Sequence, residues 1–211
     1  RVLFRSYPCL SRVVDWGGLP QGAWAPAELW LKLQIPMSSV MFRPQFSFEL
    51  AQAPEDIKAY FRLRQLIFCE EQGLFCGDDL DDTDAIAYPI IAVEQDIVAG
   101  RRVVGIVRIY EAEPGTWYGG RLGVHPNYRR VGQIGKGLIH RAVTTAHGWG
   151  CDRFLATVQL QNVGFFRRLH WHSLEPLEIC HHPHHLMEAD LAFYPPGQNP
   201  RPPLPSPAQA S

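Results

Sequence analysis

A β-strand that passes directly into a glycine-rich turn and a helix is the feature that most constrains the fold of this chain. The segment runs RLGVHPNYRRVGQIGKGLIH from Arg121 to His140. Its apolar residues predict a strand that ends at Val124, and helical spacing of apolar residues resumes at Ile134. The first N–H groups of a helix have no partner within it and lie at the positive end of its dipole, so this turn favours a phosphate group.

Two common phosphate-binding loops do not fit the turn. A Walker loop would need glycine where Arg130 stands, and Ser or Thr after Lys136, where Gly137 stands. A dinucleotide-binding fingerprint that begins at Gly135 would need glycine where His140 stands. An ordinary glycine-rich β–α turn without a ligand remains an alternative at this point.

The rest of the pattern alternates between strands and helices. Strands are expected at 46–50, 90–93, 103–109, 117–124, 154–159 and 186–193, and helices from residue 54, over 134–146 and at 163–169. Antiparallel strands come first and one β-α-β-α run follows, which indicates a mixed α/β fold. Gly119 and Gly120 inside one strand predict a β-bulge or the close approach of a ligand.

Composition excludes several classes of protein. The chain has 211 residues, of which 46% are hydrophobic, so it can bury a core. Lys and Arg number 20 against 21 Asp and Glu, so no nucleic-acid partner is expected. No run of 18 apolar residues and no secretory signal pattern occurs, so we expect no membrane partner. Five scattered cysteines favour reduced thiols in the cytoplasm.

Three regions follow from the composition along the chain. Residues 1–36 carry three tryptophans but no sustained period, so we expect a non-native or unstructured extension before the first plausible start at Met37. A genuine extension that packs through those tryptophans is the alternative. Residues 37–194 form the expected domain, and the proline-rich residues 195–211 are expected to be an extended or disordered tail.

The central segment resembles the signature of the GNAT family of acyl-CoA N-acyltransferases. The residues that fit it are Leu122, Val124, Pro126, Tyr128, Arg129 and Arg130. Downstream, QNVGFFRRLHW at 161–171 resembles the family's Asn-x-x-(Ala/Pro)-Phe-Tyr-x-x-Leu-Gly-Phe element. Upstream, LRQLIFCEEQ at 63–72 resembles the first helix of branches that include acyl-amino-acid and acyl-homoserine-lactone synthases. Residues 46–194 also resemble an uncharacterised bacterial subfamily whose genes neighbour nitrilase genes.

The resemblance implies the GNAT fold, which is α/β with a mixed central sheet and flanking helices. Two strands, 117–124 and 154–159, would splay apart around the pantetheine arm of acetyl-CoA, the acyl donor. A primary amine of a small molecule would attack the thioester directly in a ternary complex, without a metal, and a homodimer is one assembly to consider. The residues expected to contact CoA are Leu122, Gly123, Val124, Arg129, Arg130, Val131, Gly132, Gln133, Ile134, Gly135, Lys136, Gly137, Asn162, Phe165 and Phe166.

The chain departs from the family where catalysis is concerned. Phe166 replaces the usual tyrosine that protonates the thiolate, and Tyr118 lies in the strand segment where relatives often carry a glutamate base. Water is the expected proton donor, followed by Tyr118 and then His170, which replaces a glycine and is expected on the same helix face as Phe166. Glu71, at a helix end, is a candidate base or a surface charge.

These departures keep two rival functions open. One is transfer of a longer acyl chain to an amino acid, and the other is a catalytically silent CoA-binding module. Asn162 is expected to cap a helix, to contact CoA, or both.

Two polar clusters have alternative interpretations. The segment CHHPHH at 180–185 contains zinc-ligand types, but a solvated hairpin tip near the acceptor pocket is favoured over a metal site. The acidic segment 78–84 lacks the central glycine and final glutamate of a calcium loop. We expect it to be a solvated face, or a loop that favours a cationic amine.

Overall fold

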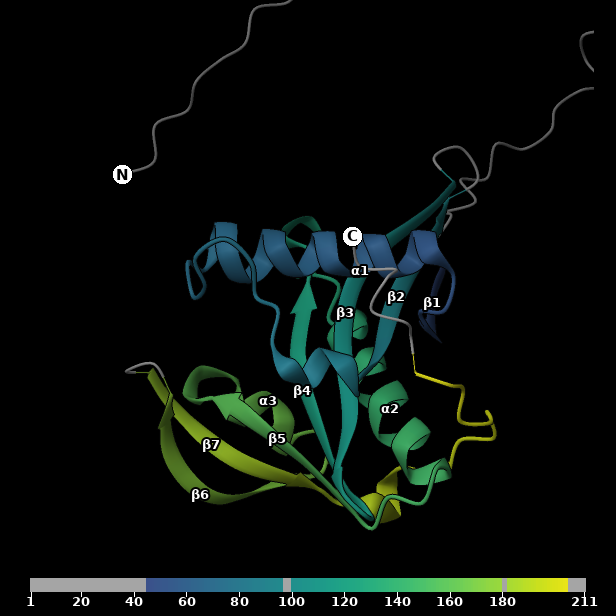
Figure 1. The fold of residues 1–211 in the computed structure, drawn as a ribbon. Coiled ribbons are helices and arrows are strands. Elements are labelled where there is room, and N and C mark those ends of the chain that lie inside the picture. The colour runs from purple at the N-terminus through teal and green to yellow at the C-terminus, as the bar shows by residue number, and fades with distance from the viewer. Residues whose placement is uncertain (1–44, 97–99, 180–181, 205–211) are drawn as a thin grey trace, which may run out of the picture. The chain divides into compact units, whose positions relative to one another are not determined.

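Seven strands form one sheet in the part of the chain that the computed structural model describes, residues 45–96, 100–179 and 182–204. The strands are β1 (Gln45–Leu50), β2 (Tyr88–Asp96), β3 (Gly100–Glu113), β4 (Thr116–Val124), β5 (Arg153–Gln159), β6 (Trp171–Ile179) and β7 (His182–Ala189). Their order in the sheet is β1-β2-β3-β4-β5-β7-β6. Neighbours are antiparallel except β4 and β5, which are parallel (Figure 1). The expectations for residues 1–36 lie outside the described residues.

Three α-helices accompany the sheet: α1 (Pro54–Arg64), α2 (Gln133–Gly148) and α3 (Val163–Arg167). A π-helix, η2 (Gln65–Glu71), continues α1, and the short 3-10 turns are η3 (Asp82–Ala85), η4 (Pro126–Tyr128), η5 (Leu160–Asn162) and η6 (Leu191–Phe193). Pro54 begins α1 with acidic residues in its first turn, as the sequence predicts. None of these helices is long and apolar enough to cross a membrane.

The sheet is buried on both faces. In β2 the successive residues Ile90–Val93 are all buried and alternate between two hydrophobic cores. The core that contains Ile91 includes Ile57 and Leu63 of α1, so α1 packs on that face. The other core holds the predicted apolar face of α2, namely Ile134, Leu138, Ile139, Ala142, Val143 and Ala146, and all six are buried. A fully buried strand shows a continuous apolar run, as this one does.

The C-terminal half differs from the expected pattern in two elements. β6 is a strand that the sequence does not reveal, because Pro176 and exposed polar residues interrupt it, which an edge strand tolerates. The expected strand at 186–193 is shifted: β7 ends at Ala189, and Asp190 then accepts a hydrogen bond from the N–H of Ala192 to begin a 3-10 turn.

Residues 195–204 have no regular secondary structure but are bound to the domain. The N–H of Gly197 donates to the carbonyl of Thr144 at 2.7 Å, and the indole N–H of Trp149 donates to the carbonyl of Asn199 at 2.7 Å. Residues 195–204 thus lack helix and strand, as an extended segment does, while two of their backbone groups find partners on and just after α2.

Candidate active site

The parallel strands β4 and β5 separate at the middle of the sheet. Their pairing covers Thr116–Gly119 on β4 and Arg153–Ala156 on β5 and then ends. Figure 1 shows the two strands diverging from this common start. The edge of β4 beyond Gly119 therefore faces an opening instead of a neighbouring strand, as the predicted splay requires.

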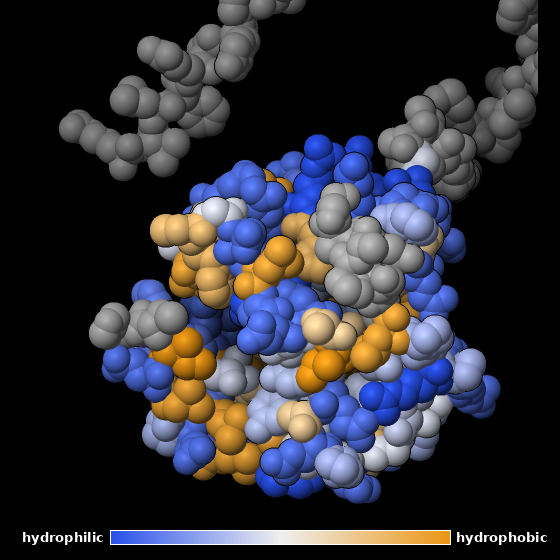
Figure 2. Space-filling model, viewed as in Figure 1, coloured by the Kyte–Doolittle hydropathy of each residue, from blue (hydrophilic) through white to orange (hydrophobic). Residues whose placement is uncertain are grey.

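A cavity of about 380 Å³ lies at this opening. Its wall is formed by residues of β3, β4, β5, α2 and α3, and by Ile179, His182 and His184 of the β6–β7 hairpin. Phe68 of η2 also lines it, as do Gln72, Leu74 and Phe75, which follow η2. On the face shown in Figure 2, hydrophobic residues gather over the β6–β7 half, to which the exposed Leu174 and Ile179 belong. The volume suits a small molecule.

β4 carries a β-bulge beside this cavity. Ile106 of β3 pairs with Gly123, and two residues later Arg108 pairs with Gly120, so β4 contains one extra residue. Arg121 in this bulge has a φ of 52°, a left-handed conformation that is uncommon outside glycine. The bulge that the paired glycines predict is present, and it turns the strand next to the cavity.

Three arginines and three aspartates form a closed network beside the cavity, which we call the Arg–Asp ring, and two of its arginines, Arg108 and Arg121, line the cavity. Its members are Arg64 of the first helix, Asp79, Asp81 and Asp84 of the following segment, Arg108 of β3 and Arg121 of β4. Each arginine contacts two of the aspartates and each aspartate contacts two of the arginines. Arg64 contacts Asp79 at 2.8 Å and Asp84 at 2.5 Å, and its side chain is fully buried.

Arginines lower the pKa values of Asp81 and Asp84 in the ring. Burial raises the pKa of Asp84, but hydrogen bonds and charge attraction from Arg64 outweigh it, so the pKa is lowered. Burial likewise raises the pKa of Asp81, but the paired hydrogen bonds from Arg108 and the charges of Arg108, Arg121 and Arg64 together outweigh burial, so this pKa is also lowered. Asp79 is only 3% exposed. Asp79, Asp81 and Asp84 are therefore paired with arginines, whereas Asp78 and Asp82 are exposed, so the solvated-face interpretation does not hold for the three ring aspartates.

The predicted phosphate turn has the expected local structure. The 3-10 turn η4 follows β4, and α2 begins after Gly132 with an N-cap that makes no side-chain capping bond. Arg130 and Lys136 are exposed beside it, and a Cβ on Gly135 would meet Phe165 no closer than 3.7 Å. The turn lies outside the residues that line the cavity. Neither Arg130 nor Lys136 has an ion-pair partner among the residues that the structure describes, and two such cations beside the free N–H groups of a helix start suit an anion.

Two of the predicted CoA-binding glycines are explained by packing. A Cβ on Gly137 would lie 2.1 Å from the ring of Phe48, and one on Gly123 would lie 2.8 Å from Cδ1 of Ile67. Both positions must stay small because β1 and the first helix pack against them. Packing alone accounts for these two glycines.

The downstream element contributes directly to the cavity. Asn162 lies at the N-cap position of α3, yet its side chain makes no capping hydrogen bond, and it lines the cavity together with Leu122 and Phe166. Its amide is therefore available to a ligand, which a purely structural cap would not be. Phe165 packs beside Gly135 at the phosphate turn.

Tyr118 is the candidate acid that the structure brings to the cavity. Its ring stacks on Tyr110 with centroids 5.7 Å apart, and both tyrosines line the wall next to Gly119 and Gly120. Tyr118 lies one residue before Gly119, the last residue of β4 that pairs with β5.

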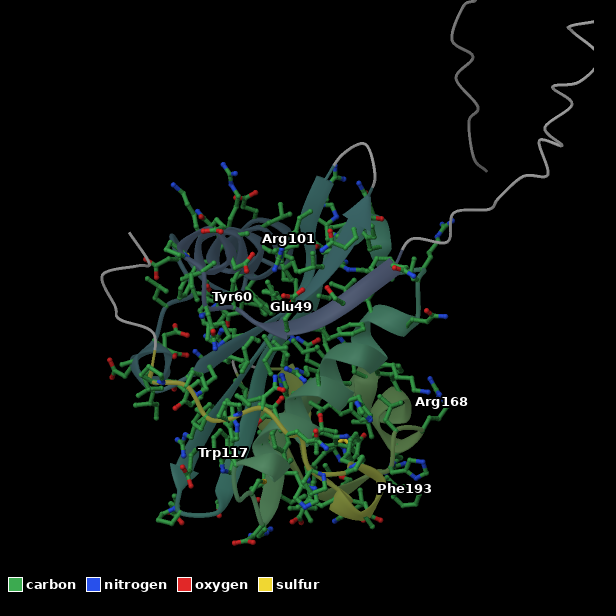
Figure 3. All side chains as sticks on the ribbon, turned by 90° about the vertical axis from the view of Figure 1, so that its right-hand side faces the viewer. Glu49, Tyr60, Arg101, Trp117, Arg168 and Phe193 are labelled. Carbon is green, nitrogen blue, oxygen red and sulfur yellow. The ribbon has the colours of Figure 1, made fainter. Side chains whose placement is uncertain are left out.

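His170 does not share a helix with Phe166. α3 ends at Arg167, so the expected helix over 163–169 is too long, and His170 follows with a φ of 62°. This left-handed φ explains why glycine is usual at the position. The imidazole stacks on Phe193, with centroids 3.6 Å apart, and His170 is not among the residues that line the cavity. Phe193, on which His170 stacks, lies at the opposite end of the domain from Tyr60 of α1 (Figure 3).

Glu71 is bound to one of the residues expected to contact CoA. Both of its carboxylate oxygens accept hydrogen bonds from Arg129, at 2.5 and 2.6 Å. The bonds from Arg129 lower the pKa of Glu71, although burial acts in the opposite direction. Arg129 also donates to the carbonyl of Val124 at 3.0 Å. The pair connects the first helix to the phosphate turn, and a lowered pKa makes Glu71 a weak base.

The histidine-rich segment belongs to the cavity wall. His182 and His184 lie in β7 and line the cavity, which agrees with a position near an acceptor pocket. Cys180 and His181 are outside the described residues. Among the residues that are described, no group of three or more His, Cys, Asp or Glu side chains is arranged to hold a metal ion.

Sequence reasoning missed the ring arginines. The sequence does not predict a role for Arg64, because it follows the apolar residues of an amphipathic helix. It does not predict one for Arg108 either, because this residue lies inside an otherwise apolar strand. The signal that could have revealed Arg108 is a charged residue between Val107 and Ile109, both of which are buried.

Comparisons with known proteins agree with this geometry. The model of the acetyltransferase (GNAT) family matches residues 48–171. A Bacillus subtilis (strain 168) protein described as an acetyltransferase is 26% identical over 140 residues, which is 63% of this chain and 88% of that protein.

Two solved structures share the fold. An N-acetyltransferase from Lactobacillus plantarum has a TM-score of 0.59 at 21% identity, over 68% of this chain and 97% of its own. The CoA-dependent acyl-homoserine lactone synthase BjaI has a TM-score of 0.55 at 19% identity, over 69% of this chain and 82% of its own. The family match covers more than half of the sequence, and the chain belongs to the acetyltransferase (GNAT) family.

Proposed function

We propose that this protein transfers an acetyl group from acetyl-CoA to a primary amine of a small molecule. The observation that carries the proposal is the separation of β4 and β5 beside a cavity of about 380 Å³, with the glycine turn at the start of α2 nearby in the chain. Backbone groups along the free edge of β4 can hydrogen-bond an extended pantetheine arm, and the turn can bind the pyrophosphate. The side chains of Asn162, Arg130 and Lys136 are available to support that binding.

The thioester of acetyl-CoA supplies an activated carbonyl. The chain's own part is to position the neutral amine beside that carbonyl, so that the C–N bond forms as the C–S bond breaks, and to supply a proton to the sulfur while the amine loses one to water. We propose Tyr118 for the second task, because it lines the cavity, whereas His170 does not. Water, which the sequence favours, is the alternative donor. Glu71 is proposed to hold Arg129 in place and not to act as a base, because its pKa is lowered.

The length of the acyl chain defines the nearest alternative. The related fold of BjaI belongs to a synthase that uses CoA thioesters, so transfer of a longer acyl group is a second candidate. A silent CoA-binding module is the third, since Phe166 has no proton to donate. A location in the cytoplasm, a homodimer and membership of the nitrilase-linked subfamily remain parts of the proposal.

A ligand panel separates these functions. Thermal shifts of the full chain would be measured with acetyl-CoA, a long-chain acyl-CoA and free CoA, followed by thiol release with an amine panel. Acetyl-CoA should raise the melting temperature and yield free CoA when the correct amine is present. Preference for the long-chain donor would favour the synthase, binding without turnover of any amine would favour the silent module, and no shift with any donor would contradict all three.

A further inference from the structure

The charged groups on the cavity wall point to the chemistry of the acceptor. Arg108 and Arg121 line the cavity, whereas no Asp or Glu of the described residues does so. The carboxylates that contact Arg108 and Arg121 belong to the Arg–Asp ring and are each shared between two arginines. From this we infer that the acceptor amine also carries a carboxylate, as an amino acid does, and that Arg121 binds it. The inference rests on the proposed function and names its substrate class.

Arg121 is held in one orientation. Its Nε donates to Asp79 at 2.9 Å, its Nη2 donates to Asp81 at 3.1 Å, and its Cζ lies 4.6 Å from the ring centre of Phe75. In the described part of the chain, Nη1 has no hydrogen-bond partner. A guanidinium fixed along one edge and free at the other is a preorganised donor for a carboxylate.

Arg108 adds a second donor without a partner. Its side chain is 6% exposed, and its Nε–H meets no acceptor among the described residues. The Nε lies 3.6 Å from the place where a Cβ on residue 120 would stand, so it lies next to Gly120, which also lines the cavity. A buried donor without an acceptor is costly, and a ligand oxygen that enters beside Gly120 would satisfy it.

The same wall disfavours a polycation. A polyamine carries positive charge away from the reacting amine and needs free carboxylates to replace its hydration. The ring offers none, because its three aspartates already have arginine partners. Phe68, Leu74 and Phe75 supply an apolar surface beside Arg121, which suits an acceptor with an apolar side chain.

Matched acceptors test the inference. Phenylalanine, leucine and methionine would each be compared with the corresponding amino acid amide and decarboxylated amine, and with spermidine, on full-length protein shown to bind acetyl-CoA. The carboxylates should have a kcat/KM at least tenfold above their neutral analogues, and spermidine should not be acetylated. Equal or faster turnover of the amines or spermidine would overturn the inference, as would a protein that acetylates other amines but no carboxylate. Failure of the proposed function would appear instead as absent acetyl-CoA binding, or as binding without turnover of any acceptor.

Two variants locate the carboxylate. Arg121→Gln should raise the KM of the carboxylate acceptor tenfold or more, bring the acid-to-amide ratio close to one and leave the KM for acetyl-CoA unchanged. Arg101→Gln, which removes an arginine from partly exposed ion pairs with Glu49 and Asp56 outside the cavity, is the matched control and should change neither.

Gly120→Ala keeps the test valid if Arg121→Gln does not fold. Gly120 is outside the left-handed region and a Cβ there makes ordinary contacts, so the variant should fold. The added methyl covers Nε of Arg108 and should lower the acid-to-amide ratio, whereas Gly164→Ala outside the cavity should not. An unchanged ratio in both Arg121→Gln and Gly120→Ala would contradict the assignment.

Discussion

At the scale of single residues, the structure separates groups that serve packing from groups that are free to meet a ligand. Gly137 and Gly123 belong to the first kind, because neighbouring side chains occupy the space where a Cβ would lie. Asn162, Tyr118 and Gly135 belong to the second, since two of them line the cavity and the third has room around it. Substitutions of Asn162, Tyr118 and Gly135 should therefore change ligand binding or turnover more than they change folding.

Gly135→Asp should weaken CoA binding at least tenfold. The change places a negative charge beside the proposed pyrophosphate position, and a charge-assisted hydrogen bond there is worth about 1.5–3 kcal/mol. The melting temperature without ligand should stay near that of the wild type, because the new Cβ makes only ordinary contacts. Titration calorimetry with CoA measures the effect, and an unchanged affinity would move the pyrophosphate elsewhere.

Tyr118→Phe should lower kcat about 100-fold while the KM for acetyl-CoA stays constant. The reason is that loss of a general acid typically costs ~10²–10⁴-fold in rate. His170→Ala serves as the comparison and should have little effect, because His170 does not line the cavity. A drop of less than about threefold for Tyr118→Phe would assign the proton to water.

At the scale of elements, local patterns could be predicted and long-range pairings could not. The turn before α2 and the buried face of α2 depend on residues close together in sequence, so their spacing reveals them. β6 was missed because an edge strand with Pro176 has no clear alternation. The cavity wall combines residues of the first helix, β3, β4 and the β6–β7 hairpin, which are distant in sequence. The ion-pair partners in the Arg–Asp ring are up to 42 residues apart, as Asp79 and Arg121 are. Sequence shows those charges but not their partners.

The Arg–Asp ring should make stability depend on acid. The pKa values of Asp81 and Asp84 are lowered in the fold, so the ring stabilises the protein above the unfolded pKa of about 4 and loses this contribution as pH falls below it. Asp84→Asn should cost about 2–3 kcal/mol at pH 7, because it leaves buried arginines without a charged partner.

Denaturant unfolding from pH 7 to pH 3 measures this effect. The difference between wild type and Asp84→Asn should shrink below about pH 4, where the wild-type carboxylates take up protons. Asp82→Asn, an exposed neighbour in the same turn, should match the wild type throughout. A difference that is constant with pH would show that the charge of Asp84 does not stabilise the fold.

At the scale of the whole molecule, the segment after β7 completes the domain instead of leaving it. Arg201 donates to the hydroxyl of Tyr88 at 3.0 Å and to Glu111 at 2.6 Å, and its Cζ lies 4.8 Å from the ring centre of Trp117. Trp117 is fully buried in the sheet, so this segment is in direct contact with the core. Proline content alone suggested a loose tail, because composition does not show where a single arginine will bind.

Arg201→Ala should lower the free energy of unfolding by about 1 kcal/mol. A cation–π contact and a partly exposed ion pair each contribute modestly, at roughly 0.5–1 kcal/mol. Arg153→Ala removes a comparably exposed ion pair without an aromatic contact and should cost less. Equal losses in the two variants, measured by urea unfolding, would argue against a stabilising role for the segment around Arg201.

A structure of the full chain with bound CoA tests the central claim most directly. The account predicts an extended pantetheine arm between β4 and β5, with its sulfur beside Tyr118 and its pyrophosphate at the turn before α2. CoA found at another surface, or no bound CoA at saturating concentration, would contradict the assignment of this opening as the acyl-donor site.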